Sequence, residues 1–238
     1  MSAILAIEAL SKHFGGFTAL DGVSLEVAEG ERFGLIGPNG SGKTTLINCV
    51  SGLLRNEAGS IRFAGEEISR LPAYRRARRG IARSFQVPRP FHKMTVLENL
   101  LVPSAYVIHM KDADGEARAM EILEGIGLAA KAQAHAAQLS QVELRKLELA
   151  RAMAARPKLL VSDEAMAGLS GAEVDDVLKI LFALNAQGIT IIMIEHIMQA
   201  VMRFSQRVVC LDAGRIIAEG SPQTIVQNAD VQRAYLGA

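Results

Sequence analysis

One stretch decides the fold of this chain: Gly37-Pro38-Asn39-Gly40-Ser41-Gly42-Lys43-Thr44. It matches the pattern GxxxxGK[ST], and it lies where the pattern requires, between the apolar strand predicted at Arg32–Ile36 and the helix predicted at Thr44–Leu54. Glycines let backbone N–H groups approach phosphate oxygens without a Cβ in the way, and the helix N-terminus adds the positive end of its dipole. The stretch therefore predicts a phosphate-binding P-loop.

The side chains of this loop suit ATP and Mg²⁺. Lys43 can bridge the β- and γ-phosphates, and the Thr44 hydroxyl can ligate the metal. The predicted ATP-binding residues are Gly37, Pro38, Asn39, Gly40, Ser41, Gly42, Lys43, Thr44 and Thr45.

A P-loop also needs a carboxylate at the end of another buried strand, and Lys158–Ser162 supplies it by running into Asp163-Glu164. Asp163 is expected to hold Mg²⁺ through water, and Glu164 is expected to polarise the attacking water. The alternative is an acidic pair that merely ends a strand at the surface, and the P-loop disfavours it.

Composition excludes several classes of protein. The 238 residues suit one domain, or one domain with a sub-domain. The 26 Lys and Arg nearly cancel the 25 Asp and Glu, and this balance argues against nucleic-acid binding. Cys49 and Cys210 are predicted to be reduced thiols. No apolar run approaches the roughly 18 residues that span a bilayer, and the N-terminus lacks the order of a signal peptide, so we expect a soluble chain.

Strand and helix patterns alternate along the chain. Further strands are predicted at Ile4–Leu10, Val23–Val27, Ser60–Phe63 and Ile189–Ile194. Further helices are predicted at Val96–Leu101 with Thr95 as N-cap, Ala117–Ile126, Glu143–Ala155 and Val174–Asn185. The pattern predicts an α/β fold with a P-loop core, a mostly parallel sheet and a small antiparallel part. We expect one domain over 1–238, with its core in 1–86 and 155–238 and a helical sub-domain in 87–154.

With these motifs in place, the whole sequence resembles the ATP-binding subunits of ABC transporters. By this resemblance Gln86 is the residue that senses the γ-phosphate and contacts the metal, and His196 is the switch histidine that donates to a phosphate oxygen. Glu164, His196 and Gln86 are then the expected catalytic residues, and Thr44, Gln86 and Asp163 the expected metal ligands. In this family an aromatic residue stacks on adenine. Phe14 is the first candidate and Phe17 the second, and a core phenylalanine is the alternative.

Four segments narrow the resemblance to the ATPases of branched-chain amino acid importers and their hydrophobic amino acid, amide and urea relatives. They are Ser84-Phe85-Gln86, Met94–Leu100, Met166–Leu169 and the tail Val231–Gly237. The resemblance implies a peripheral subunit on the cytoplasmic face of the membrane. Its implied partners are a second ATPase, two membrane permease subunits and an extracytoplasmic solute-binding protein, with no nucleic acid.

The segment that resembles the family's signature departs from it. ABC dimers bind each ATP between one P-loop and the partner's signature, usually LSGGQ, which corresponds here to Ser140, Gln141, Val142 and Glu143 after Leu139. Both glycines are absent, and Val142 places a β-branched side chain where backbone must approach phosphate. Losing one oriented donor costs about 10²–10³ in rate. We expect this chain's own site to be catalytic and the partner's site to be slow, and the alternative is that neighbouring backbone adapts.

Two other functions stay open. A regulatory subunit would bind ATP without useful hydrolysis, and a non-transport ABC ATPase would predict a second cassette or a long coiled-coil insertion. Arg75, Arg76, Arg78, Arg79 and Arg83 form a basic cluster that is interpreted as a solvated helix face, with contact to anionic lipid, an acidic partner or nucleic acid as alternatives. By resemblance, Val87–Met94 forms part of the groove that receives a permease helix.

Overall fold

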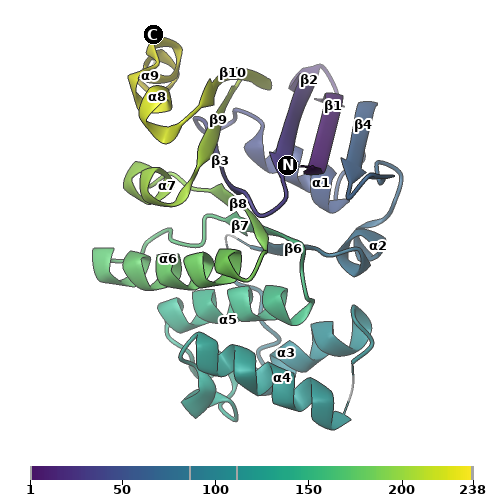
Figure 1. The fold of residues 1–238 in the computed structure, drawn as a ribbon, viewed down its shortest axis with the longest axis vertical. Coiled ribbons are helices and arrows are strands. Elements are labelled where there is room, and N and C mark those ends of the chain that lie inside the picture. Colours follow the sequence, from purple (N-terminus) through teal and green to yellow (C-terminus); the bar gives the residue numbers. More distant parts are fainter. Residues whose placement is uncertain (1, 86, 111, 237–238) are drawn as a thin grey trace.

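The computed structural model describes residues 2–85, 87–110 and 112–236, and its centre is a six-stranded sheet (Figure 1). The strand order is β10-β9-β3-β8-β7-β6, with β10 antiparallel to β9 and the other pairs parallel. These strands are β3 (Arg32–Ile36), β6 (Ile81–Ser84), β7 (Leu159–Asp163), β8 (Thr190–Ile194), β9 (Arg207–Asp212) and β10 (Arg215–Gly220). The prediction of a mostly parallel α/β sheet is confirmed.

A second sheet covers the P-loop side of the first, and its four strands are antiparallel in the order β2-β1-β4-β5. Its strands are β1 (Ala3–Phe14), β2 (Phe17–Ala28), β4 (Ala58–Phe63) and β5 (Glu66–Glu67). They pack with helix α1 (Lys43–Ser51) over one face of the central sheet. The predicted small antiparallel part is confirmed.

Both faces of the central sheet are buried, which is why its strands read as apolar runs rather than alternating ones. Phe33 and Leu35 of β3 face α1 and the small sheet, whereas Ile191 and Met193 of β8 face a second core. Three helices supply much of that second core: α5 (Gln141–Ala154), α6 (Gly171–Ala186) and α7 (Met198–Phe204).

Helices dominate the segment 87–154, at one end of the molecule (Figure 1). Helix α3 (Val96–Tyr106) packs against α4 (Asp112–Gly125) and α5, and two short 3₁₀ helices, η1 (Ala129–Lys131) and η2 (Ala136–Gln138), precede α5. Thr95 caps α3 as predicted: its side chain accepts from the N–H of Glu98, whose carboxylate accepts from the N–H of Thr95.

Several elements were not predicted from the sequence. They are β5, β6, α2 (Ala73–Arg78), η1, η2, α7, β9, β10, α8 (Pro222–Gln227) and α9 (Ala229–Leu236). Strand β6 is short and contains Arg83, so it lacks the apolar run that identifies the other parallel strands. The helices α2, α7, α8 and α9 have only six to eight residues, which is too short for a clear helical periodicity in the sequence.

The interpretation of the basic cluster as a solvated face is wrong for Arg76. Its side chain is 1% exposed, and its guanidinium donates to the carbonyl oxygens of Val50, Ser69 and Leu71. Burial lowers the pKa of Arg76, and the carbonyls at the end of α1 supply the acceptors that a buried cation needs. Arg75 and Arg78 are exposed on α2 and Arg79 is half-buried at its end, whereas the side chain of Arg83 is only 9% exposed, so the interpretation is also wrong for Arg83.

Cys49 and Cys210 are both buried and make no disulfide. In the described part of the chain, no helix has the length and apolar character needed to cross a bilayer.

Candidate ATP site

The ends of the parallel strands bring the predicted site residues together. Strand β3 runs into the P-loop, the neighbouring β8 runs into Glu195 and His196, and β7 beside it ends at Asp163. In parallel strands these carboxyl ends meet at one edge of the sheet, where α/β proteins bind ligands. Residues far apart in the sequence therefore line one site. Gln86, another predicted site residue, follows β6 in the sequence and lies outside the described residues.

The glycines of the P-loop are required by the space around them. Gly37 has φ 148°, and a Cβ there would collide with the carbonyl oxygen of Leu211. Gly42 caps α1 with φ 107°, and a Cβ there would lie 2.6 Å from the carbonyl oxygen of Ala19. Both positions combine a left-handed backbone with a backbone neighbour that cannot move cheaply. The loop can thus approach a phosphate closely.

Lys43 is 6% exposed, and its side chain folds back onto the backbone of the P-loop. Its Nζ donates to the carbonyl oxygens of Gly37 at 2.7 Å and Pro38 at 3.0 Å. Burial lowers the pKa of this ammonium, against the opposing effect of Glu164. Phosphate oxygens are stronger acceptors for a buried cation than these carbonyls, so the side chain is placed to exchange one set for the other.

A cavity of about 240 Å³ opens beside the loop. Its lining residues are Phe14, Phe17, Ala19, Asn39, Gly40, Ser41, Gly42, Lys43, Thr44, Thr45, Glu164 and His196. Gly37 and Pro38 lie outside this lining. Both candidate adenine-stacking residues are exposed at its rim, Phe14 by 48% and Phe17 by 61%, so the choice between them stays a prediction. The polar P-loop, the aromatic residues at the rim and the carboxylate of Glu164 together fit a nucleotide with a metal at its phosphates.

Glu164 and His196 contact each other inside the cavity. His196 Nε2 lies 2.9 Å from Glu164 Oε1, and the N–H of Glu164 donates to the carbonyl of Ile194. Glu164 has φ 48°, a left-handed conformation that a non-glycine residue adopts at a cost of about 1–3 kcal/mol. The backbone therefore turns away from the direction of β7 at Glu164, and the carboxylate lies in the cavity beside His196 and the P-loop.

Two further features of the site were missed by sequence reasoning. Asp163 forms a buried ion pair with Arg83, whose Nη2 lies 2.6 Å from Asp163 Oδ2. Glu195 is 1% exposed, and its Oε1 accepts from the N–H of Met166 at 2.9 Å. Burial raises the pKa of Glu195 to about 7. Neither partner could be assigned from spacing, because each contact joins segments that meet only in the folded sheet.

The C-terminal helix α9 also reaches the P-loop. The N–H of Gly37 donates to the hydroxyl of Tyr235 at 2.8 Å, and burial raises the pKa of that phenol. The predicted tail motif therefore has a structural partner, although Gly237 lies outside the described residues.

The signature residues do not line this chain's cavity. Ser140 is the N-cap of α5, and it forms a reciprocal pair with Glu143 through the two backbone N–H groups. Glu143 also contacts Lys131 at 2.6 Å, and this bond, ahead of the bond from the Ser140 N–H, lowers the pKa of the carboxyl. Gln141 is exposed and Val142 half-buried.

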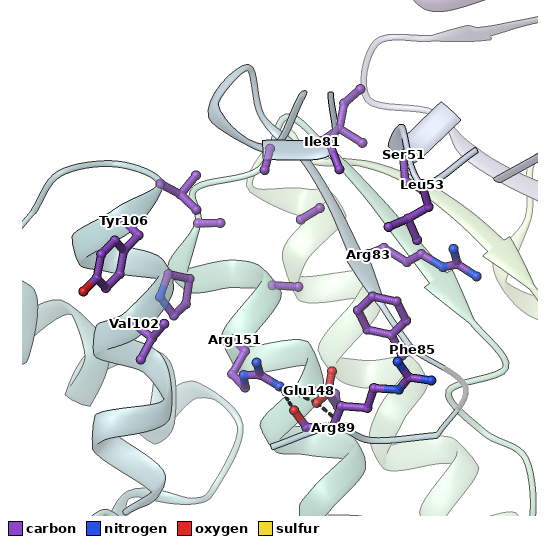
Figure 2. Close-up of a pocket in the computed structure, with 17 residues that line it drawn as sticks. Ser51, Leu53, Ile81, Arg83, Phe85, Arg89, Val102, Tyr106, Glu148 and Arg151 are labelled. Atoms are coloured by element: carbon purple, nitrogen blue, oxygen red, sulfur yellow. Dashed lines mark hydrogen bonds and ion pairs between the residues drawn. The ribbon is translucent and has the colours of Figure 1, made fainter. Parts of the chain in front are cut away.

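A groove of about 400 Å³ lies between the core and the helices of 87–154 (Figure 2). Strand β6, α2 and the end of α1 form one wall, and α3 and α5 form the other. Figure 2 shows Glu148 joined to Arg89 and Arg151: its Oε1 accepts from Arg151 Nη1 at 2.6 Å and from the N–H of Arg89 at 2.8 Å. The groove is therefore mostly apolar with a charged, hydrogen-bonded end.

A P-loop, an acidic pair and a histidine at neighbouring strand ends define an ATP-hydrolysing site. The ABC transporter family model matches residues 20–167, and a second model, branched-chain amino acid ATP-binding cassette transporter, matches residues 215–238. The chain belongs to the ABC transporter family, as an ATP-binding cassette that hydrolyses ATP.

Two curated relatives resemble it over nearly their full length. The high-affinity branched-chain amino acid transport ATP-binding protein BraF of Pseudomonas aeruginosa is 39% identical, with 98% of both chains covered. The corresponding protein LivG of Escherichia coli is 38% identical, again with 98% of both covered.

Two solved structures have the same fold. A nucleotide-free ATP-binding cassette from an ABC transporter matches with a TM-score of 0.92 at 33% identity, covering 100% of both chains. The ADP conformation of MJ1267, an ATP-binding cassette of an ABC transporter, matches with a TM-score of 0.91 at 34% identity and the same coverage.

Proposed function

We propose that this chain hydrolyses ATP to drive import of branched-chain amino acids or related small solutes. One observation carries the proposal: residues 215–238 match the model named for branched-chain amino acid cassettes, in addition to the near full-length likeness to BraF and LivG. That segment contains Tyr235, whose hydroxyl contacts the P-loop at Gly37. The part of the chain most typical of the subgroup is thus joined to the ATP site.

Glu164 and His196 would carry the hydrolysis. Glu164 polarises the attacking water, and His196 holds its carboxylate in place through the 2.9 Å contact. Because both side chains line the cavity with Lys43, His196 can exchange this contact for a γ-phosphate oxygen when ATP is bound. Gln86 is proposed, from the family resemblance, to report the same phosphate.

Thr44 and Asp163 would hold Mg²⁺, with Gln86 as a further ligand. Thr44 lines the cavity at the start of α1, and Asp163 ends β7 directly before Glu164. Mg²⁺ in nucleotide sites takes most of its ligands from phosphates and water, so few protein oxygens are needed. When bound, the metal neutralises charge on the β- and γ-phosphates.

The degenerate signature makes the two ATP sites of a dimer unequal. Ser140 offers a hydroxyl at the start of α5, but Gln141 and Val142 replace the glycines that would let backbone approach the partner's γ-phosphate. We therefore propose a hetero-dimer in which a second ATPase supplies an intact signature to this chain's site. This chain in turn supplies a weak one to its partner.

The groove would receive a helix from the membrane permease. Its apolar walls come from both the core and the helices of 87–154, so an inserted helix would sense movement between them. Arg83, Arg89 and Arg151 leave the groove with more positive than negative charge beside Glu148. We expect the docking helix to present an apolar face and an acidic side chain.

Changing Glu164→Gln tests the inequality of the sites. In the assembled importer this change should reduce ATP turnover by at least about 10³-fold, whereas the same change in the partner ATPase should have little effect. Turnover is measured as phosphate release at saturating ATP. Equal losses from the two changes would refute the asymmetry. Strong turnover by a dimer of this chain alone would refute the need for a partner.

Purification from solubilised membranes tests the transport function itself. The chain should bring with it a second ATPase, two permease subunits and a solute-binding protein, and the complex in vesicles should take up labelled leucine or a related solute when ATP is supplied. Ribosomal or DNA-repair proteins in place of these partners would contradict the proposal.

A further inference from the structure

Arg83 connects the proposed metal carboxylate with the groove. Its guanidinium donates from Nη2 to Asp163 Oδ2 at 2.6 Å and from Nη1 to Asn48 Oδ1 at 2.6 Å. The pair is well buried, with the side chains of Arg83 and Asp163 only 9% and 8% exposed. A buried pair of this kind is held firmly, because breaking it would leave a charge without a partner.

The position of Asn48 places this contact beside the metal site. Thr44 and Asn48 are separated by four residues on α1, so their side chains lie one above the other on the same face of the helix. Arg83 spans from Asn48 to Asp163, whereas the metal is expected between Thr44 and Asp163. The guanidinium and Mg²⁺ would therefore compete for the carboxylate of Asp163. Their other contacts, Asn48 and Thr44, lie one helical turn apart on α1.

The other side of Arg83 faces the groove. Arg83 and Phe85 both line it, and the guanidinium carbon lies 5.3 Å from the centre of the Phe85 ring (Figure 2). Arg89 lies 5.8 Å from the same ring. Phe85 thus packs against Arg83 at the wall of the groove, where a docked helix would contact this ring. The Nε of Arg83 is buried and has no hydrogen-bond partner among the described residues.

We infer that Arg83 is a positioning residue for Mg²⁺: it holds Asp163 in this conformation, weakens the affinity of the site for the metal, and releases the carboxylate when Phe85 moves in the groove. The inference rests on the proposed roles of Asp163 and of the groove. Docking of the permease would then affect the metal site through two side chains in contact, Phe85 and Arg83, at the end of β6.

The test measures how nucleotide affinity depends on Mg²⁺. Full-length chain is titrated with a fluorescent, non-hydrolysable ATP analogue over a series of free Mg²⁺ concentrations, and in EDTA. Removing one positive charge beside the carboxylate in Arg83→Met should lower the half-saturating Mg²⁺ concentration about ten-fold, which corresponds to about 1.4 kcal/mol. Affinity in EDTA should stay unchanged. A purely structural role would instead shift the affinities with and without metal alike.

Two further variants keep the test valid if Arg83→Met does not fold. Arg83→Lys keeps the charge but cannot make both contacts or stack on the ring, so its shift should be in the same direction and smaller. Phe85→Leu removes the ring and should also shift the Mg²⁺ dependence in that direction. Arg79→Met is the matched control, because Arg79 contacts Glu66 at the surface, outside the groove.

Asp163→Asn separates failure of this inference from failure of the metal assignment. If Asp163→Asn abolishes the Mg²⁺ dependence but Arg83→Met, Arg83→Lys and Phe85→Leu leave it at the wild-type value, the role of Arg83 is refuted and the metal site stands. If Asp163→Asn itself has no effect, the assignment of Asp163 is wrong and the inference falls with it.

Discussion

Glu195 should make the stability of this protein fall as the pH rises from about 4.5 to 7. The side chain is 1% exposed and accepts a hydrogen bond from the N–H of Met166. Its pKa in the folded chain is about 7, raised chiefly by burial and further by the nearby charges of Glu164 and Asp163. The ordinary value of 4.5 applies when the chain is unfolded.

The sign follows from proton binding. Between pH 4.5 and 7 the folded chain keeps the proton of Glu195 while the unfolded chain has lost it, so rising pH favours unfolding. Stability from this group is full below pH 4.5 and is lost by the time the pH has passed 7. The difference in pKa corresponds to a loss on the order of 3 kcal/mol.

The variant Glu195→Gln tests this directly. Glutamine carries no proton to lose, and its carbonyl can still accept from Met166. The free energy of unfolding is measured by urea unfolding, followed by far-UV circular dichroism, at pH 5, 6, 7 and 8. From pH 5 to pH 8 the variant should become more stable relative to the wild type by on the order of 3 kcal/mol. Circular dichroism is the suitable probe because the chain has no tryptophan.

The matched control is Glu124→Gln, the same change at an exposed position on α4. It should leave the pH dependence of the unfolding free energy as in the wild type. If Glu195→Gln also keeps the wild-type slope between pH 5 and 7, the carboxyl is not held protonated by burial, and the reasoning is refuted.

Two other substitutions test the P-loop surroundings. Gly37→Ala should lower the free energy of unfolding by at least about 2 kcal/mol, because the added Cβ meets the backbone of Leu211. At Gly40 the added Cβ meets open space, so Gly40→Ala should lower it by about half as much. Both values are measured by urea unfolding. Similar losses at both glycines would contradict the collision. Tyr235→Phe removes the acceptor for the N–H of Gly37 and should cost about 1 kcal/mol in the same assay, and no loss would mean that water replaces the hydroxyl.

The fold was largely predictable because its decisive signals are local. The strand Arg32–Ile36 was predicted with the bounds that the structure shows, and Thr95 was predicted as the cap of α3. Both signals depend on residues adjacent in the chain: an apolar run ending at glycines, and a side chain that reaches the N–H three residues on. Strand β6 failed the same reasoning because Arg83 interrupts its apolar run.

The sequence by itself determined which residues carry the chemistry of ATP, since the P-loop pattern and the acidic pair are each contiguous and each follow an apolar strand. Only the tertiary structure decided their partners. The contacts of Asp163 with Arg83, Glu195 with Met166, and Gly37 with Tyr235 join residues 80, 29 and 198 positions apart. Such contacts depend on strand order and on which face of a strand or helix a side chain takes, and no local pattern encodes either.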